Sequence, residues 1–168
     1  MLQQMIFNIA KMNGRVWAYL SSKELSNEMA EAISNETVYF LDGWNAHGTS
    51  LAGAHEIRDK RFLIIKVDEE KYGASGCSID KQLKFIKETE QKYSIELLNR
   101  LLVAYKSNTG KIEVVSPSKI KDLFGLGEIN ENTIIYNPSI STSAELESNF
   151  EIPLKKSWLN EKYNLVAA

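Results

Sequence analysis

The chain has one cysteine, three prolines and no long run of apolar residues among its 168 residues. A single cysteine excludes an intramolecular disulfide and every zinc site that needs several cysteines. No window approaches the length of a membrane span, and polar residues interrupt the apolar group around Met5, so no secretory h-region is predicted. We therefore expect a cytoplasmic protein with no membrane span.

The chain also lacks a large excess of one sign of charge, because the formal net charge is −2 and the isoelectric point is near 5.8. Such a balance gives no general attraction to nucleic acid or to anionic lipid, which usually need a concentrated basic face. Lysines do gather at Lys81, Lys84 and Lys87, but Glu88 and Glu90 follow directly, as is typical of a solvated helix face. We expect no nucleic-acid partner.

Several motifs that carry chemistry are missing. The phosphate-binding G-x-x-x-x-G-K-[ST] and the serine-hydrolase G-x-S-x-G are absent, and the glycines do not follow Rossmann spacing. The two histidines, His47 and His55, would need several carboxylates to hold a metal ion. We predict no ATP hydrolysis, no metal site and no cofactor.

Periodicity predicts alternating strands and helices in the first half of the chain. Large and small side chains alternate over 15–21, which predicts a strand, and apolar residues at helical spacing over 23–36 predict a helix capped by Ser21 or Ser22. The β-branched and aromatic run 38–44 favours a second strand, and the small polar residues of 45–54 favour an irregular connection. The apolar run 62–67 is typical of a central strand, which residues 55–58 join through a turn at Asp59 and Lys60.

The second half begins with an amphipathic helix over 80–93, with Ile79, Leu83, Ile86 and Tyr93 on its apolar side. Residues 101–105 and 112–115 flank S-N-T-G and predict a β-hairpin. A short helix over 116–124, a strand over 133–136, a helical turn or loop over 141–148 and a terminal helix over 157–163 complete the prediction.

The predicted order of elements favours the α+β class, with one mixed, mostly antiparallel sheet and helices mainly on one face. A doubly wound parallel sheet would need more crossover helices than the sequence offers. No repeat or linker divides residues 15–168, which we expect to form a single domain. Residues 1–14 are expected to be an N-terminal extension, in which Leu2, Met5, Ile6 and Ile9 share one helical stripe.

The only cysteine lies in the stretch G-A-S-G-C-S-I-D, residues 73–80, where a Gly/Ser turn meets the predicted helix. Unpaired backbone N–H groups and the positive end of the helix dipole favour a thiolate or a bound anion there. Cys77 is therefore a candidate nucleophile, for which His47 is the candidate base. The alternative is that Cys77 is a small buried residue packed where a tight turn meets the core.

The neighbours of the cysteine also have two interpretations. Ser75, Gly76, Ser78 and Asp80 are candidates for contacts with a ligand, through backbone donors that the helix leaves unused. The same residues are typical of turn and cap chemistry, with Ser78 or Asp80 accepting from N–H groups of the first turn. A carboxylate at Asp80 would repel a bound anion, which disfavours a phosphate site.

A second candidate segment is W-N-A-H-G, residues 44–48, in which an aromatic ring, an amide, an imidazole and a permissive glycine are close together. Such a mixture can form a pocket wall that includes Trp44 and Asn45. Alternatively, Trp44 packs in the core, Asn45 closes a turn and His47 donates to a carbonyl. Because the strand 62–67 returns the chain toward Trp44, we predict that Trp44, His47 and Cys77 share one neighbourhood.

The combination of R-V-W at residues 15–17, W-N-A-H-G and A-S-G-C-S-I-D resembles a family of small uncharacterised proteins from Bacteroidetes, some of which carry the label "ABC transporter ATPase". The resemblance covers most of the chain from Arg15 onward. It implies a cytoplasmic bacterial protein and brings no established catalytic residues. We do not transfer the label, because it conflicts with the missing Walker A lysine and with the short length of the chain.

These observations lead to three functional hypotheses. The first is a binding or accessory domain that presents residues 44–48 and 75–80 to an unidentified small molecule or protein. The second is a thiol-dependent enzyme that uses Cys77 with His47. The third is a homodimeric structural or interaction protein in which both segments are closed and buried.

Overall fold

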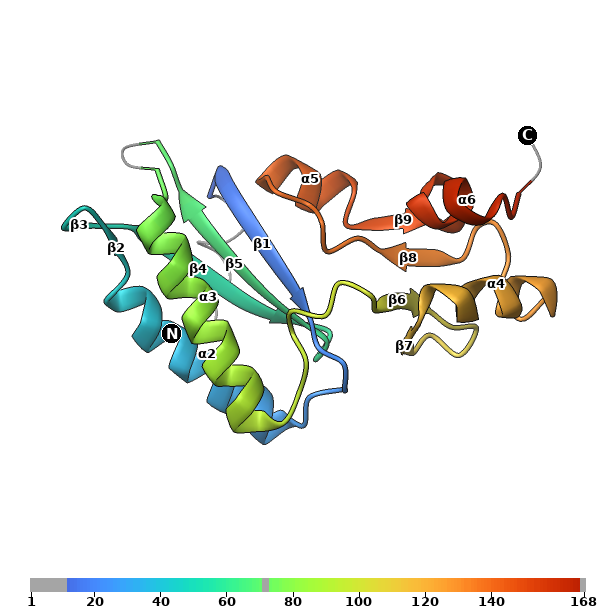
Figure 1. Cartoon of the computed structure of the whole chain (residues 1–168), viewed down its shortest axis with the longest axis horizontal. Helices are drawn as coiled ribbons and strands as arrows, with labels where there is room; N and C mark the ends of the chain where they lie inside the picture. Colours follow the sequence, from blue (N-terminus) through green and yellow to red (C-terminus); the bar gives the residue numbers. More distant parts are fainter. Residues whose placement is uncertain (1–11, 71–72, 167–168) are drawn as a thin grey trace.

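The computed structural model describes residues 12–70 and 73–166 of the chain. Its first half contains a three-stranded sheet with the strand order β1-β5-β4. The strands are β1 (Gly14–Leu20), β4 (Ala52–Arg58) and β5 (Phe62–Asp68), and both pairings are antiparallel. Two helices, α2 (Asn27–Asp42) and α3 (Gly76–Tyr93), lie side by side over one face of this sheet (Figure 1).

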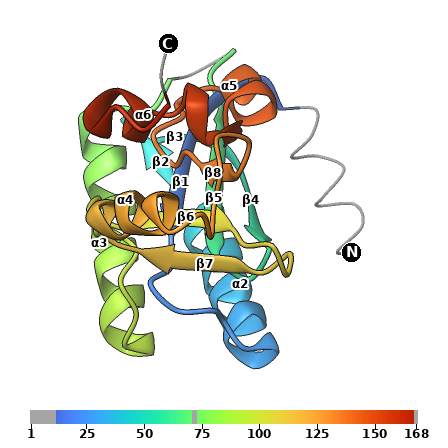
Figure 2. The ribbon, with the colours of Figure 1, turned by 90° about the vertical axis from the view of Figure 1, so that its right-hand side faces the viewer.

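The second half forms a four-stranded sheet with the order β7-β6-β8-β9, again with antiparallel pairings. Its strands are β6 (Val103–Lys106), β7 (Ile112–Val115), β8 (Ile134–Tyr136) and β9 (Glu151–Pro153). The remaining elements are α4 (Pro117–Gly125), α5 (Ser143–Ser148), the 3-10 turn η1 (Leu154–Lys156) and α6 (Trp158–Tyr163). Figure 2 shows α4 and α6 stacked on the side of this sheet that faces away from the first half.

Three apolar clusters hold these layers together. The first lies between α2, α3 and the first sheet, and it includes Ile33, Ile65 and Ile86. The second lies between the two sheets, because it combines side chains of β1 and β5 with Tyr136 and Phe150. The third lies beneath α4 and α6. Since the second cluster draws on both halves, the two sheets pack against each other through it.

The α+β class predicted from the sequence is confirmed, and all pairings between the described strands are antiparallel. The strands are distributed over two larger sheets and one two-stranded sheet, in place of the single sheet that we expected. The first strand, the strands on either side of Asp59 and Lys60, the hairpin around residues 107–110 and the helix after Ser116 are all present. The predicted N-terminal stripe falls within residues 1–11, outside the described residues.

The predicted strand over residues 38–44 is wrong, because α2 continues through this run to Asp42. The β-branched and aromatic composition favours a strand locally, but Ile33, Thr37 and Leu41 recur at a spacing of four and are the buried residues of the helix. Packing of this stripe on the first sheet outweighs the local propensity. The helix also begins later than predicted, with Ser26 as its cap in place of Ser21 or Ser22.

Helix α3 begins at Gly76, one turn before the predicted start at Asp80. Its buried residues are Ser78, Gln82, Ile86 and Thr89, so the buried face is rotated from the predicted one and includes polar side chains. Leu83, which we placed on the apolar side, is 37% exposed. The rotation follows from the capping of the helix by Ser75, which turns Ser78 inward.

Candidate functional site

The two segments singled out in the sequence lie against each other. The indole Nε1 of Trp44 donates a hydrogen bond of 2.8 Å to the backbone carbonyl of Ser78. Nearby, the Lys81 ammonium donates to the Asn45 Oδ1 at 3.0 Å. Trp44 is therefore in contact with the first turn of α3, as predicted, whereas the proximity of His47 to Cys77 stays a prediction.

The W-N-A-H-G segment is a tight β-hairpin and not an irregular connection. Strands β2 (Asn45–Ala46) and β3 (Thr49–Ser50) pair across His47 and Gly48, whose φ angles are 49° and 81°. Positive φ at both central residues is the signature of a type I′ turn, which joins two short strands directly. The pair His-Gly between two strand residues was the sequence signal for this hairpin.

Trp44 packs in the core and Asn45 closes a turn, as in the alternative to a pocket wall. Trp44 is 1% exposed and contacts the Trp17 ring edge-on, with 6.0 Å between the ring centroids. The Asn45 side-chain amide donates to the Gly43 carbonyl at 3.0 Å and closes the turn. His47 stands exposed at the tip of the hairpin. In the described part of the chain, its side chain donates to no carbonyl.

Cys77 is exposed, so its interpretation as a small buried core residue is wrong. The cysteine lies within the first turn of α3 and not in the loop ahead of it, because the helix begins at Gly76. His47 is exposed as well. Its pairing with Cys77 as a catalytic base stays a prediction.

The serines around Cys77 form a capping box. The Ser75 Oγ accepts from the Ser78 backbone N–H at 3.3 Å, and the Ser78 Oγ accepts from the Ser75 N–H at 2.8 Å. The prediction that side chains of this segment cap the helix is confirmed, but the N-cap is Ser75 and not Ser78 or Asp80. The Ser75 and Ser78 hydroxyls therefore serve the helix, whereas Gly76, Cys77 and Asp80 are exposed.

An open groove of about 730 Å³ runs between α2 and α3 beside the joined segments. Its apolar lining includes Trp44 and the rings of Phe40 and Phe85, which stack with centroids 4.7 Å apart and planes 7° apart. Tyr39 also lines the groove and is 85% exposed. The sequence prediction missed this groove because it assigned residues 38–44 to a strand.

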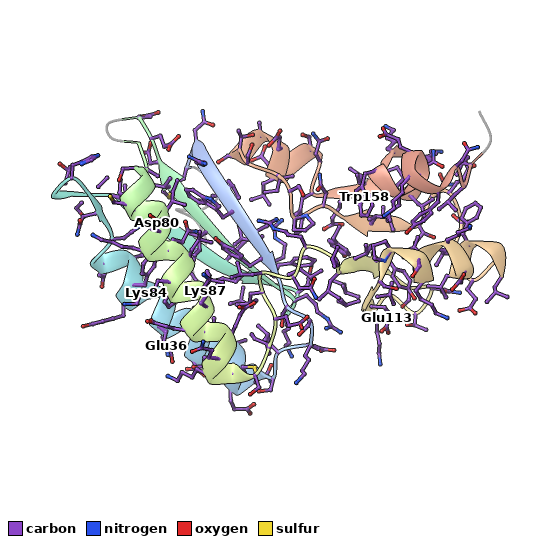
Figure 3. All side chains as sticks on the ribbon, in the orientation of Figure 1. Glu36, Asp80, Lys84, Lys87, Glu113 and Trp158 are labelled. Atoms are coloured by element: carbon purple, nitrogen blue, oxygen red, sulfur yellow. The ribbon has the colours of Figure 1, made fainter. Side chains whose placement is uncertain are left out.

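Charged side chains of both signs surround the aromatic lining. Figure 3 shows Asp80, Lys84 and Lys87 along α3 and Glu36 on the neighbouring α2. Glu36 accepts hydrogen bonds of 2.6 Å from the Lys92 ammonium and from the Tyr93 hydroxyl, which tie α2 to α3. Burial alone would raise the pKa of Glu36, but these two hydrogen bonds hold it below its usual value.

Within residues 12–70 and 73–166, no group of three or more histidine, cysteine or acidic side chains lies together in a way that could hold a metal ion. In the same residues, no helix has both the length and the apolar character that crossing a membrane requires. Comparisons with protein-family models, with curated proteins and with solved structures give no match. The resemblance to the Bacteroidetes family therefore stays a prediction.

Proposed function

We propose that this chain is a cytoplasmic binding or accessory domain, and that its ligand is a short segment of a protein partner. The segment would place an aromatic side chain, flanked by acidic residues, in the groove between α2 and α3. The observation that carries the proposal is the aromatic lining of this groove, in which the exposed Tyr39 lies beside the half-buried Phe40 and Phe85.

The aromatic lining supports an aromatic ligand group. Tyr39 extends the stacked pair of Phe40 and Phe85 toward solvent, and a tyrosine that is 85% exposed leaves most of its apolar ring in water. A further ring that covers it would gain buried apolar area and an aromatic contact of about 0.5–1.5 kcal/mol. Groups of this kind are the usual anchors of protein interfaces.

The charges around the groove support acidic flanking residues. Glu36 is already engaged by Lys92 and Tyr93, and Glu88 faces Lys84 along the same helix. Lys81 and Lys84 line the groove, and Lys87 follows one turn later on α3. Because Lys84 is already paired with Glu88, Lys81 is the lining cation that would face an acidic residue of the segment.

The proposal is tested with short peptides and a fluorophore on the single, exposed cysteine. Acetyl-Glu-Trp-Glu-amide should quench or shift the emission of the Cys77 label in a saturable way. Acetyl-Lys-Trp-Lys-amide and acetyl-Glu-Gly-Glu-amide should bind more weakly. Tyr39→Ser should weaken binding of the first peptide about fivefold, which corresponds to the ~1 kcal/mol of one aromatic contact.

Leu126→Ser is the matched control, because Leu126 is 69% exposed and lies after α4 in the other half of the molecule. This variant should bind the acidic peptide as the unchanged chain does. Equal affinity for all three peptides, or equal weakening by both substitutions, would refute the proposal.

A thiol-dependent enzyme is the second candidate function, and the exposure of Cys77 is the observation that favours it. A nucleophilic thiolate must be reached by its substrate, which a buried cysteine would not allow. His47, on the hairpin that contacts the same turn of α3, is the proposed base.

A further inference from the structure

A second cleft, of about 520 Å³, lies on the other side of the first sheet from the groove. It is formed where the turn between β4 and β5 faces the turn between β6 and β7. The first turn contributes Asp59 and Lys60, both with positive φ, and the second contributes Gly110. Tyr136 of β8 lines the cleft between them.

Four cationic side chains line this cleft. Lys60 and Arg61 come from the first turn, and Lys106 and Lys111 come from the second. In the part of the chain that the structure describes, none of the four ammonium or guanidinium groups forms an ion pair. Two separate pairs of cations therefore line one space.

Arg61 brings a guanidinium group to the cleft. This group offers planar, paired N–H donors that match carboxylate and phosphate oxygens, so it favours an anionic ligand. Its Nε is buried and has no hydrogen-bond partner within the described residues, so the terminal nitrogens are the donors that a ligand in the cleft would engage.

Three carboxylates also line the cleft, from Glu24, Asp59 and Glu151, so that four cations and three anions leave a balance of +1. Burial, followed by the charges of Glu151 and Asp59, raises the pKa of Tyr136 to about 12. The phenol is therefore a protonated donor at neutral pH. The carboxylates weaken the attraction for any single anionic group, so a ligand that reaches the cations of both turns is favoured.

We propose that this cleft binds a small molecule with at least two anionic groups, one held by Lys60 and Arg61 and the other by Lys106 and Lys111. Phosphate and carboxylate groups share the required chemistry, since both accept hydrogen bonds from ammonium and guanidinium groups. The proposal is independent of the α2–α3 groove, which shares no lining residue with the cleft.

Isothermal titration of the full chain with pyrophosphate, citrate and orthophosphate tests the proposal. At least one of the first two should bind saturably, and orthophosphate should bind at least about tenfold more weakly than that ligand. Binding of pyrophosphate alone assigns phosphate chemistry, and binding of citrate alone assigns carboxylate chemistry. Orthophosphate affinity equal to that of both larger anions, or no saturable binding of any, overturns the proposal.

Substitutions of the lining residues test whether the anion binds in the cleft. Lys106→Ala with Lys111→Ala removes two exposed side chains and should weaken binding of the anion about tenfold. Arg61→Lys keeps the charge but loses the planar donor set, and it should weaken binding as well. Lys119→Ala with Lys121→Ala, on the exposed face of α4, is the matched control and should leave binding unchanged. Equal weakening by the control pair would contradict a cleft site.

Discussion

The indole N–H of Trp44 and the backbone carbonyl of Ser78 form a buried hydrogen bond of 2.8 Å between residues that are 34 positions apart. Trp44 lies between the end of α2 and the start of β2, and Ser78 lies in the first turn of α3. Together with the hydrogen bond from Lys81 to Asn45, this contact holds the start of the hairpin that carries His47 against the first turns of α3. It also fixes one end of the groove between the two helices.

Trp44→Phe should lower the free energy of unfolding by about 1–3 kcal/mol, because the Ser78 carbonyl loses its buried donor and the smaller ring leaves part of the indole volume unfilled. Urea unfolding followed by circular dichroism measures this change. Trp158→Phe is the matched control, since Trp158 is 45% exposed, and it should change stability by less than about 0.5 kcal/mol. Equal effects of the two substitutions would contradict the structural role of the contact.

Gln82→Leu should raise the free energy of unfolding by about 1 kcal/mol, an unusual direction for a core substitution. The Gln82 side chain is fully buried, and neither its Nε2 nor its Oε1 has a partner within the described residues. Leucine fills a similar volume without an unsatisfied polar group. Gln91→Leu, on the exposed face of the same helix, should have little effect. A destabilised Gln82→Leu variant would mean that the amide is satisfied.

Glu36→Gln should destabilise the chain at neutral pH, because it removes the charge that Lys92 and Tyr93 engage. The pKa of Glu36 is lowered in the folded chain, so its contribution is complete above the unfolded pKa near 4.5 and is lost as the pH falls through the folded pKa. Thermal unfolding should show a smaller difference between the two proteins at pH 3 than at pH 7. A difference that is as large at pH 3 as at pH 7 would contradict this linkage.

The exposed Cys77 should react with iodoacetamide in the folded chain at neutral pH. If the thiol-enzyme hypothesis is right, the rate exceeds that of a free model thiol, because donors at the helix N-terminus stabilise the thiolate. His47→Gln should then lower the rate, and His55→Gln should not. A rate equal to that of the model thiol, unchanged by His47→Gln, would remove the enzyme hypothesis.

Strong local signals made several elements predictable from the sequence. The alternation around Trp17 and the apolar run 62–67 identified two strands that pair with each other. The turn at Asp59 and Lys60 identified the connection of the second of these strands to β4. The contact between Trp44 and Ser78 was expected from a return of the chain to the end of a strand over 38–44, but that run is helical, so the contact is present for another reason. The strands and turns depend on periodicity and turn chemistry, which are properties of residues close together in the sequence.

The groove was not predictable in the same way, because it depends on how α2 packs. Val38, Tyr39 and Phe40 have the composition of a strand, and only burial of Thr37 and Leu41 on the first sheet keeps them helical. The cleft at Arg61 was missed for a related reason. Its cations come from turns of two different sheets, and their proximity follows from packing between the sheets and not from any motif.

The central claim is that the groove beside Trp44 and Ser78 is the ligand surface. Its most direct test is a titration of the isotopically labelled chain with acetyl-Glu-Trp-Glu-amide, followed by two-dimensional 1H–15N NMR spectra. We predict that the shifted resonances are the Trp44 indole N–H and the amides of residues 39–45 and 78–88, and that Tyr39→Ser reduces these shifts. Shifts spread evenly over both halves, or confined to residues outside these ranges, would contradict the claim.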